Sequence, residues 1–156
     1  MKHEKDYQVS TMVAAIKSGY SSYMERAEAL ERKVFTMYRV IVADDEPEFR
    51  KWLKSILEGS DDFQVVGDAD TGTEAIRLVE SLVPDLVIAD IYMPEVDGLE
   101  VAGYIQRHFP SVRAILVSVH EERIYERLAR EKGALAFIPK ARVSLDALRQ
   151  TLQGEG

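Results

Sequence analysis

The sequence predicts an α/β fold, namely a doubly wound five-stranded parallel sheet with helices on both faces, preceded by an N-terminal helix. Two observations predict this fold. Five short apolar segments recur from residue 38 onward, and segments with apolar residues at helical spacing lie between them. A third observation, that polar residues follow most of the apolar segments, indicates where a site lies, because ligands bind at the carboxyl ends of such strands.

The predicted strands are short and largely β-branched, with no strict alternation of polar and apolar positions. This pattern is typical of strands that are buried on both faces of a parallel sheet. The strands are expected at residues 40–43, 65–67, 86–89, 114–117 and 134–138.

The predicted helices carry apolar residues three and four positions apart. They are expected at residues 47–57, 73–83, 99–109, 121–132 and 144–152. A glycine or proline follows each of the first four, and Ser144 provides an N-cap for the last. Five successive β-α units of this kind imply a layered α/β domain with right-handed crossovers.

Residues 1–37 have a different pattern and are predicted to form a helical extension, with the main domain at 38–153. Their apolar residues repeat at intervals of three and four over three and a half heptads, about the minimum for a coiled coil. Three interpretations remain open: a homodimer through residues 11–37, a helix docked on its own domain, or a weakly ordered tail before the true start. The repeat consists of Val13, Ile16, Tyr20, Tyr23, Ala27, Leu30, Val34 and Met37.

The composition is that of a cytoplasmic globular protein, with 46% hydrophobic and 30% charged residues and no cysteine. No apolar segment is long enough to span a membrane, and the N-terminus lacks the apolar core of a signal peptide. The net charge is −7, and residues after 37 carry 14 Lys/Arg against 22 Asp/Glu. This balance argues against direct binding to nucleic acid, which requires clustered basic residues.

Polar residues follow four of the five predicted strands, so the fold would bring them to one edge of the sheet. Carboxylates gathered there repel one another unless a hard cation such as Mg²⁺ joins them. A carboxylate beside such an ion can attack phosphorus, and an ammonium and a hydroxyl can stabilise the charge that develops. The residues are Asp44, Asp45 and Glu46 after the first strand, Asp90 after the third, Ser118 after the fourth and Lys140 after the fifth.

In this order the residues resemble the receiver domain of two-component response regulators, over residues 38 to about 153. The resemblance implies a flavodoxin-like receiver fold and a phosphorylation switch rather than an enzyme. Asp90 would accept a phosphoryl group from a sensor histidine kinase or a phosphotransfer protein. The motif residues are Asp44-Asp45, Asp90 with Met93-Pro94 and Asp97-Gly98, Ser118, and Lys140.

The resemblance also assigns the metal ligands. Asp45, Asp90 and the backbone carbonyl of Tyr92 would bind Mg²⁺, and Asp44 would hold the ion directly or through water.

Further roles fall on residues near the phosphoacceptor. Phe137 matches the aromatic position that turns inward when the Ser118 hydroxyl follows the phosphoryl group, which relays the change to the surface of the last helices and strand. Tyr92 and His120 would lie at the rim of the pocket, where we expect their rings to shield the phosphoryl group from water. Two alternatives stay open: both rings point to solvent, or a neutral His120 hydrogen-bonds the attacking water and speeds hydrolysis.

Two departures from the family pattern matter. Ala141 stands where many receivers have a cis proline, and the absence of that proline resembles the LuxR/NarL-type subfamily. Val119 is bulkier than the usual residue at its position and would crowd the pocket. Only four residues follow Leu152, so we expect no DNA-binding output domain. The chain would be a stand-alone regulator of the chemotaxis kind with a downstream protein partner, or a receiver from a longer regulator.

Two other functions stay open at this point. One is a Mg²⁺-dependent phosphatase of the haloacid-dehalogenase kind, although those enzymes have Asp-x-Asp after the first strand and this chain has adjacent aspartates. The other is a scaffold that keeps the fold without the switch, which the intact set of site residues disfavours.

Overall fold

The structure, a computed structural model, describes residues 13, 19, 22–28 and 37–154. The chain divides into two compact units, Met1–Met37 and Tyr38–Gly156. In the first unit, residues 22–28 are helical, and Val13 and Tyr23 are exposed. Half of the predicted heptad repeat, namely Ile16, Tyr20, Leu30 and Val34, lies outside the described residues. Dimerisation through residues 11–37 therefore stays a prediction.

The second unit contains a five-stranded sheet in which every neighbouring pair of strands is parallel, in the order β2-β1-β3-β4-β5. This arrangement confirms the predicted doubly wound sheet. The strands are β1 (Tyr38–Ala43), β2 (Phe63–Ala69), β3 (Leu86–Asp90), β4 (Arg113–Ser118) and β5 (Ala136–Pro139).

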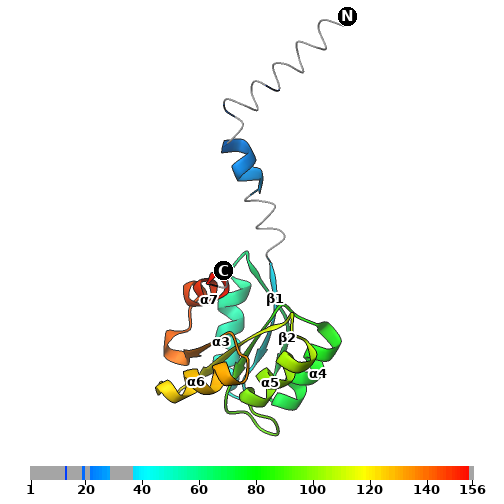
Figure 1. The fold of residues 1–156 in the computed structure, drawn as a ribbon, viewed down its shortest axis with the longest axis vertical. Coiled ribbons are helices and arrows are strands. Elements are labelled where there is room, and N and C mark those ends of the chain that lie inside the picture. Colours follow the sequence, from blue (N-terminus) through cyan, green and yellow to red (C-terminus); the bar gives the residue numbers. More distant parts are fainter. Residues whose placement is uncertain (1–12, 14–18, 20–21, 29–36, 155–156) are drawn as a thin grey trace, which may run out of the picture. The chain divides into compact units, whose positions relative to one another are not determined.

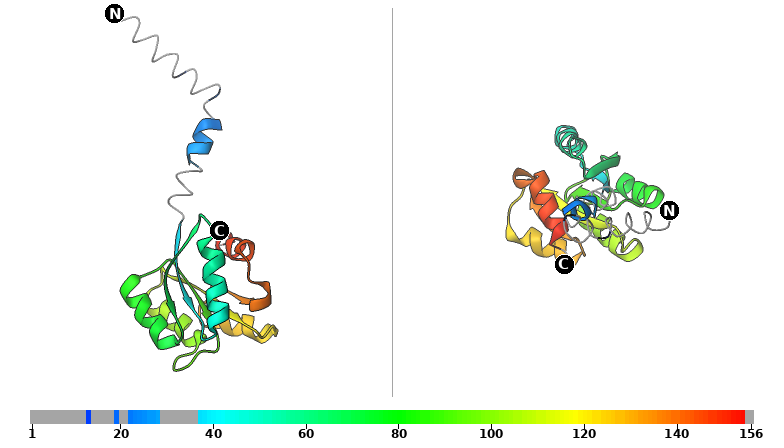
Figure 2. Two further views of the ribbon diagram at one scale, coloured as in Figure 1. Left: turned by 180° about the vertical axis from the view of Figure 1, so that it is seen from behind. Right: turned by 90° about the horizontal axis from the view of Figure 1, so that it is seen from above.

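Helices cover both faces of the sheet (Figure 1). They are α3 (Pro47–Glu58), α4 (Gly72–Leu82), α5 (Gly98–His108), α6 (Arg123–Glu131) and α7 (Leu145–Gln153), with a short 3-10 helix η1 (Lys140–Arg142) before α7. The view from behind shows α3 in front of the sheet, with α7 beside it (Figure 2). The three other α-helices of this unit pack on the opposite face.

Each face of the sheet has its own apolar core, because neighbouring residues of a strand point to opposite faces. Val40 and Val42 of β1 pack with Leu53 of α3 and Leu148 of α7. Ile41, between them, packs in the other core with residues of α4, α5 and α6. The central strands are buried on both sides, which explains why their sequences showed no alternation.

The predicted elements shift by a few residues at their ends. Helix α6 starts at Arg123 rather than at residue 121, and β5 starts at Ala136 rather than at residue 134. Gly133 has a φ of +86°, and the N–H of Ala134 still donates to the carbonyl of Ala129 in α6. These residues therefore turn the chain from the helix into the strand.

The strand order places the predicted site at one edge. Strand β1 pairs with β2 on one side and β3 on the other, so strand order reverses between β1 and β3. Ala43 pairs with Ala89, and Asp90 pairs with Val117. The residues that follow β1 therefore lie beside the end of β3. Among the described residues, no helix has the length and apolar character needed to cross a membrane.

Candidate functional site

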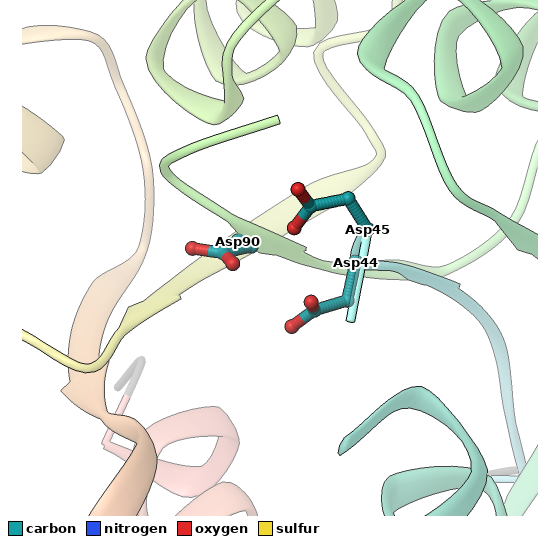
Figure 3. Close-up of side chains that lie close together, drawn as sticks. All are labelled: Asp44, Asp45 and Asp90. Carbon is teal, nitrogen blue, oxygen red and sulfur yellow. The ribbon is translucent and has the colours of Figure 1, made fainter. Parts of the chain in front are cut away.

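Three carboxylates gather where β1 and β3 end. Asp44 and Asp45 directly follow β1, and Asp90 is the last residue of β3 (Figure 3). One carboxylate oxygen from each of the three lies within 4.8 Å of the other two. Asp44 and Asp90 are buried, whereas Asp45 is exposed to solvent. The three side chains thus offer hard oxygen ligands to one cation on the side that solvent can reach.

Lys140 neutralises part of this charge from the end of β5. Its ammonium lies 2.8 Å from Asp44 Oδ2 and 3.0 Å from Asp90 Oδ2, and its side chain is only 8% exposed. A third carboxylate, that of Glu46, lies 3.3 Å from the same nitrogen. The ring of Phe49 completes the surroundings, with its centroid 4.5 Å from Nζ. The Lys140 ammonium therefore contacts three carboxylates and the face of one aromatic ring.

Burial and neighbouring charges shift the pKa values of Asp90 and Lys140. Burial raises the pKa of the Asp90 carboxyl, and the nearby Asp44 charge raises it further, against the opposing effect of Lys140. Burial alone would lower the pKa of Lys140, but the close carboxylates of Asp44 and Asp90 outweigh this effect and the pKa is raised. Lys140 is thus firmly held as a cation beside Asp90.

Asp44 Oδ2 is the incompletely satisfied atom of the cluster. It is buried and accepts no hydrogen bond from the described residues, although the Lys140 ammonium lies close to it outside hydrogen-bonding geometry. Asp44 Oδ1, in contrast, accepts the backbone N–H of Glu46. A buried carboxylate oxygen with no donor is costly unless a cation joins it. Because the Lys140 ammonium already lies 2.8 Å from that atom, the fit to a hard divalent ion rests on the three carboxylates, whose oxygens lie within 4.8 Å of one another.

The predicted hydroxyl and the loop after Asp90 lie at the same edge. Ser118, the last residue of β4, is completely buried, and its Oγ accepts the backbone N–H of His120 at 3.2 Å. The backbone N–H of Tyr92 donates to Asp90 Oδ1 at 3.1 Å. Ser118 follows Val117, the residue that pairs with Asp90 across the two strands. The loop after β3 is thus hydrogen-bonded to Asp90, and the loop after β4 is hydrogen-bonded to Ser118.

Close packing fixes the position of the Asp90 strand end. Gly98, the first residue of α5, lies against the backbone of Asp90 and Ile91, and its N–H donates to the carbonyl of Ile91 at 2.8 Å. A Cβ atom at Gly98 would overlap the Asp90 carbonyl group. Glycine is therefore required here for close approach of two backbones.

The predicted rim and switch residues belong to one group of rings. The Tyr92 ring lies 5.5 Å from the His120 ring, and Tyr125 of α6 contacts both. Tyr125 also contacts Phe137, the predicted switch residue, at 5.8 Å. Val119 is 70% exposed, and its predicted crowding of the pocket stays a prediction.

Sequence reasoning missed three residues of the site. Glu46 is one of the acidic residues after the first predicted strand but received no role, and Phe49 and Tyr125 lie within the predicted helices 47–57 and 121–132. Glu46 is next to the Asp44-Asp45 pair, which was the available signal. The contacts of the two rings depend on helix orientation, so no local pattern could have identified them.

Comparison with known proteins assigns this chain to one family. Residues 40–153 match the response regulator receiver domain. The chain therefore belongs to the receiver domain family of two-component response regulators.

Individual relatives agree with this assignment. The transcriptional regulatory protein DegU of Brevibacillus brevis is 31% identical over 119 residues, which cover 74% of this chain and 50% of DegU. The probable transcriptional regulatory protein NarL of Mycobacterium tuberculosis is 33% identical over 114 residues, which cover 73% of this chain and 53% of NarL. The chain spans about half the length of these curated relatives.

Solved structures share the fold. The signal receiver domain of the NarL response regulator from Mycobacterium tuberculosis superposes with a TM-score of 0.70 at 32% identity, covering 75% of this chain and 94% of that chain. The CheX–CheY–BeF3–Mg²⁺ complex from Borrelia burgdorferi gives a TM-score of 0.67 at 25% identity, covering 75% and 87%. The LuxR/NarL-type resemblance and the receiver fold are both confirmed.

Proposed function

We propose that this protein is a phosphorylation switch in which Asp90 accepts a phosphoryl group from a sensor histidine kinase or a phosphotransfer protein. A carboxylate oxygen of Asp90 attacks phosphorus, and an acyl phosphate forms as the phosphorus–nitrogen bond to the donor histidine breaks. The released imidazole keeps the electron pair of that bond and takes up a proton. The observation that carries the proposal is the buried Asp90 carboxylate with the Lys140 ammonium 3.0 Å away.

Lys140 and Ser118 have distinct tasks in this proposal. The Lys140 ammonium stabilises negative charge on the transferring oxygens, because it is nearly excluded from water and fixed before the reaction begins. Within the described part of the chain, the Ser118 hydroxyl has one hydrogen-bond partner, the backbone N–H of His120, which it accepts, so its own proton can point toward a phosphoryl oxygen.

Mg²⁺ is the cofactor that this donor set favours. Asp44, Asp45, Asp90 and the backbone carbonyl of Tyr92 would hold it, and the three carboxylate oxygens within 4.8 Å of one another support the fit. When bound, the ion neutralises the carboxylates and the phosphoryl oxygens, which lowers the barrier to their approach. The related CheY complex contains Mg²⁺ and BeF3, which agrees with this assignment.

The signal would leave the site through Ser118 and Phe137. When the Ser118 hydroxyl moves toward the phosphoryl group, the loop that it holds through the His120 N–H moves with it. The Phe137 ring then turns inward, and the surface of β5, α6 and α7 changes. A downstream protein partner would recognise that surface. Direct binding of the chain to nucleic acid is not part of the proposal.

Intact mass spectrometry tests the proposal. Full-length protein is incubated with acetyl phosphate or phosphoramidate, with Mg²⁺ or with EDTA. We expect one phosphoryl group per chain, dependent on Mg²⁺ and lost in Asp90→Asn. Asp70→Asn is the matched control, because Asp70 follows the neighbouring strand β2 and is not part of the carboxylate cluster. Equal labelling of Asp90→Asn and the wild type would refute the site assignment.

A further inference from the structure

Four aromatic rings form a continuous group beside the Asp90 pocket, and each comes from a different element. Tyr92 follows β3, His120 follows β4, Tyr125 lies on α6, and Phe137 lies on β5. Tyr125 contacts all three of the others, at centroid distances between 5.5 and 6.1 Å. No described aromatic contact joins Tyr92 or His120 directly to Phe137. Tyr125 is therefore the ring through which the group is connected.

A polar contact strengthens this connection. The hydroxyl groups of Tyr92 and Tyr125 are 2.6 Å apart, a good hydrogen-bond distance. That bond is the largest of the influences that raise the pKa of Tyr125 to about 12, so the Tyr125 hydroxyl keeps its proton at neutral pH. Tyr92 is 52% exposed, and an exposed ring on a loop would otherwise sample several rotamers. The hydrogen bond to Tyr125 of α6 favours the rotamer in which that bond is made.

The two rings that contact Tyr125 near the pocket stand in equivalent positions. Tyr92 lies two residues after Asp90 and donates its backbone N–H to that carboxylate. His120 lies two residues after Ser118 and donates its backbone N–H to that hydroxyl. Their rings meet edge to face, and the His120 ring stacks on Tyr125 at 28° between planes. Helix α6 thus contacts, through Tyr125, the rings of both residues whose backbones bond to Asp90 and Ser118.

We propose that Tyr125 is a positioning residue for the Asp90 site, which holds Tyr92 and His120 in place and thereby slows the attack of water on the phosphoryl group. This inference rests on the proposed phosphorylation of Asp90. Hydrolysis requires a water molecule in line with the bond that breaks, so the rate depends on how often the rim rings move aside. Movement of α6 would open the rim, which links the lifetime of the phosphorylated state to this helix.

The test compares variants that remove the same hydrogen bond from either side. Tyr125→Phe and Tyr92→Phe each lose one hydroxyl and keep the ring. Full-length proteins are phosphorylated with phosphoramidate and Mg²⁺, the donor is removed, and loss of the phosphoryl group is followed by intact mass. We expect decay about two- to tenfold faster in each variant, from the free energy of one hydrogen bond. The double variant should decay no faster than either single variant, because one shared bond is lost in all three.

Tyr104→Phe is the matched control. The Tyr104 hydroxyl donates to Glu80 on α4, away from the ring group, so this variant also loses a tyrosine hydrogen bond. Its decay should match that of the wild type, even where urea unfolding shows a similar loss of stability. A general structural effect of removing a hydroxyl would instead change all three single variants alike.

Several results would overturn the inference. They are decay at the wild-type rate in Tyr125→Phe, slower decay in that variant, or additive acceleration in the double variant. Failure of the proposed function is a different result, namely no label on the wild type or full label on Asp90→Asn.

Discussion

The close approach of α5 to the end of β3 leads to a paired prediction in one helix. A Cβ atom at Gly98 would lie 2.8 Å from the Asp90 carbonyl carbon and 2.9 Å from Ile91 Cα, and its overlap with the carbonyl oxygen is closer still. Ordinary contacts begin near 3.4 Å. The overlap with the carbonyl oxygen requires the backbone that carries Asp90 to shift by about one ångström, and overpacking of this kind costs about 1–3 kcal/mol or more.

An alanine at Gly103, in the same helix, should change the stability of the domain in the opposite direction. A Cβ atom there would meet the end of the Arg107 side chain at 3.2 Å, and that flexible group can move away. Alanine is preferred to glycine inside a helix by about 0.5–1 kcal/mol. Gly103→Ala should therefore stabilise the domain, and the two alanine variants should differ in unfolding free energy by about 2–4 kcal/mol.

Urea unfolding, followed by the fluorescence of Trp52, the sole tryptophan, measures this difference. The rate of phosphoryl labelling is the second readout. Displacing Asp90 from Lys140 should slow labelling of Gly98→Ala by about tenfold or more, whereas Gly103→Ala should label at the wild-type rate. Equal stability of Gly98→Ala and the wild type, or equal destabilisation of both variants, would refute this account of the packing.

Three further predictions concern local features. Val83 ends α4 with a φ of +42°, a backbone conformation that disfavours a β-branched side chain. Val83→Gly should therefore raise the free energy of unfolding by about 1 kcal/mol, and a lower urea midpoint would contradict this. Two hydrogen bonds from Arg149 hold the pKa of Asp62 below its usual 3.8, so this pair stabilises the fold above about pH 4 and the benefit disappears in acid. The gap in stability between the wild type and Asp62→Asn should accordingly shrink as the pH falls below 4, and a gap independent of pH would argue against the pair. Asp45→Ala should weaken Mg²⁺ binding by about tenfold or more, measured as quenching of Trp52 fluorescence. The Trp52 ring contacts Phe49, and the Phe49 ring contacts Lys140 of the site. Unchanged quenching would remove Asp45 from the ligand set.

The architecture could be predicted from the sequence because the relevant signals are local. The apolar run 86–89 has no alternation because β3 is buried on both faces, and a proline or glycine follows several helices where the chain must turn. The ends were less predictable. Residues 121 and 122 have no feature that separates them from the helical pattern, yet Glu122 is an extended N-cap outside α6.

The site could be predicted in part for the same reason. Asp44, Asp90 and Lys140 were expected to meet because strand ends in a parallel sheet meet at one edge, and the structure brings them together. The contacts of Glu46 and Tyr125 could not be predicted in this way. They depend on the rotation of a helix and the path of a loop, which are set by packing over the whole domain rather than by neighbouring residues.

Peptide mapping after borohydride reduction tests the central claim most directly. Borohydride converts an acyl phosphate on an aspartate to an alcohol, which marks the phosphorylated residue in a peptide spectrum. Full-length protein is labelled with phosphoramidate and Mg²⁺, reduced and digested. The account predicts reduction at Asp90 alone, and none in Asp90→Asn. Reduction at Asp44, at Asp45 or at a carboxylate outside the cluster would contradict it.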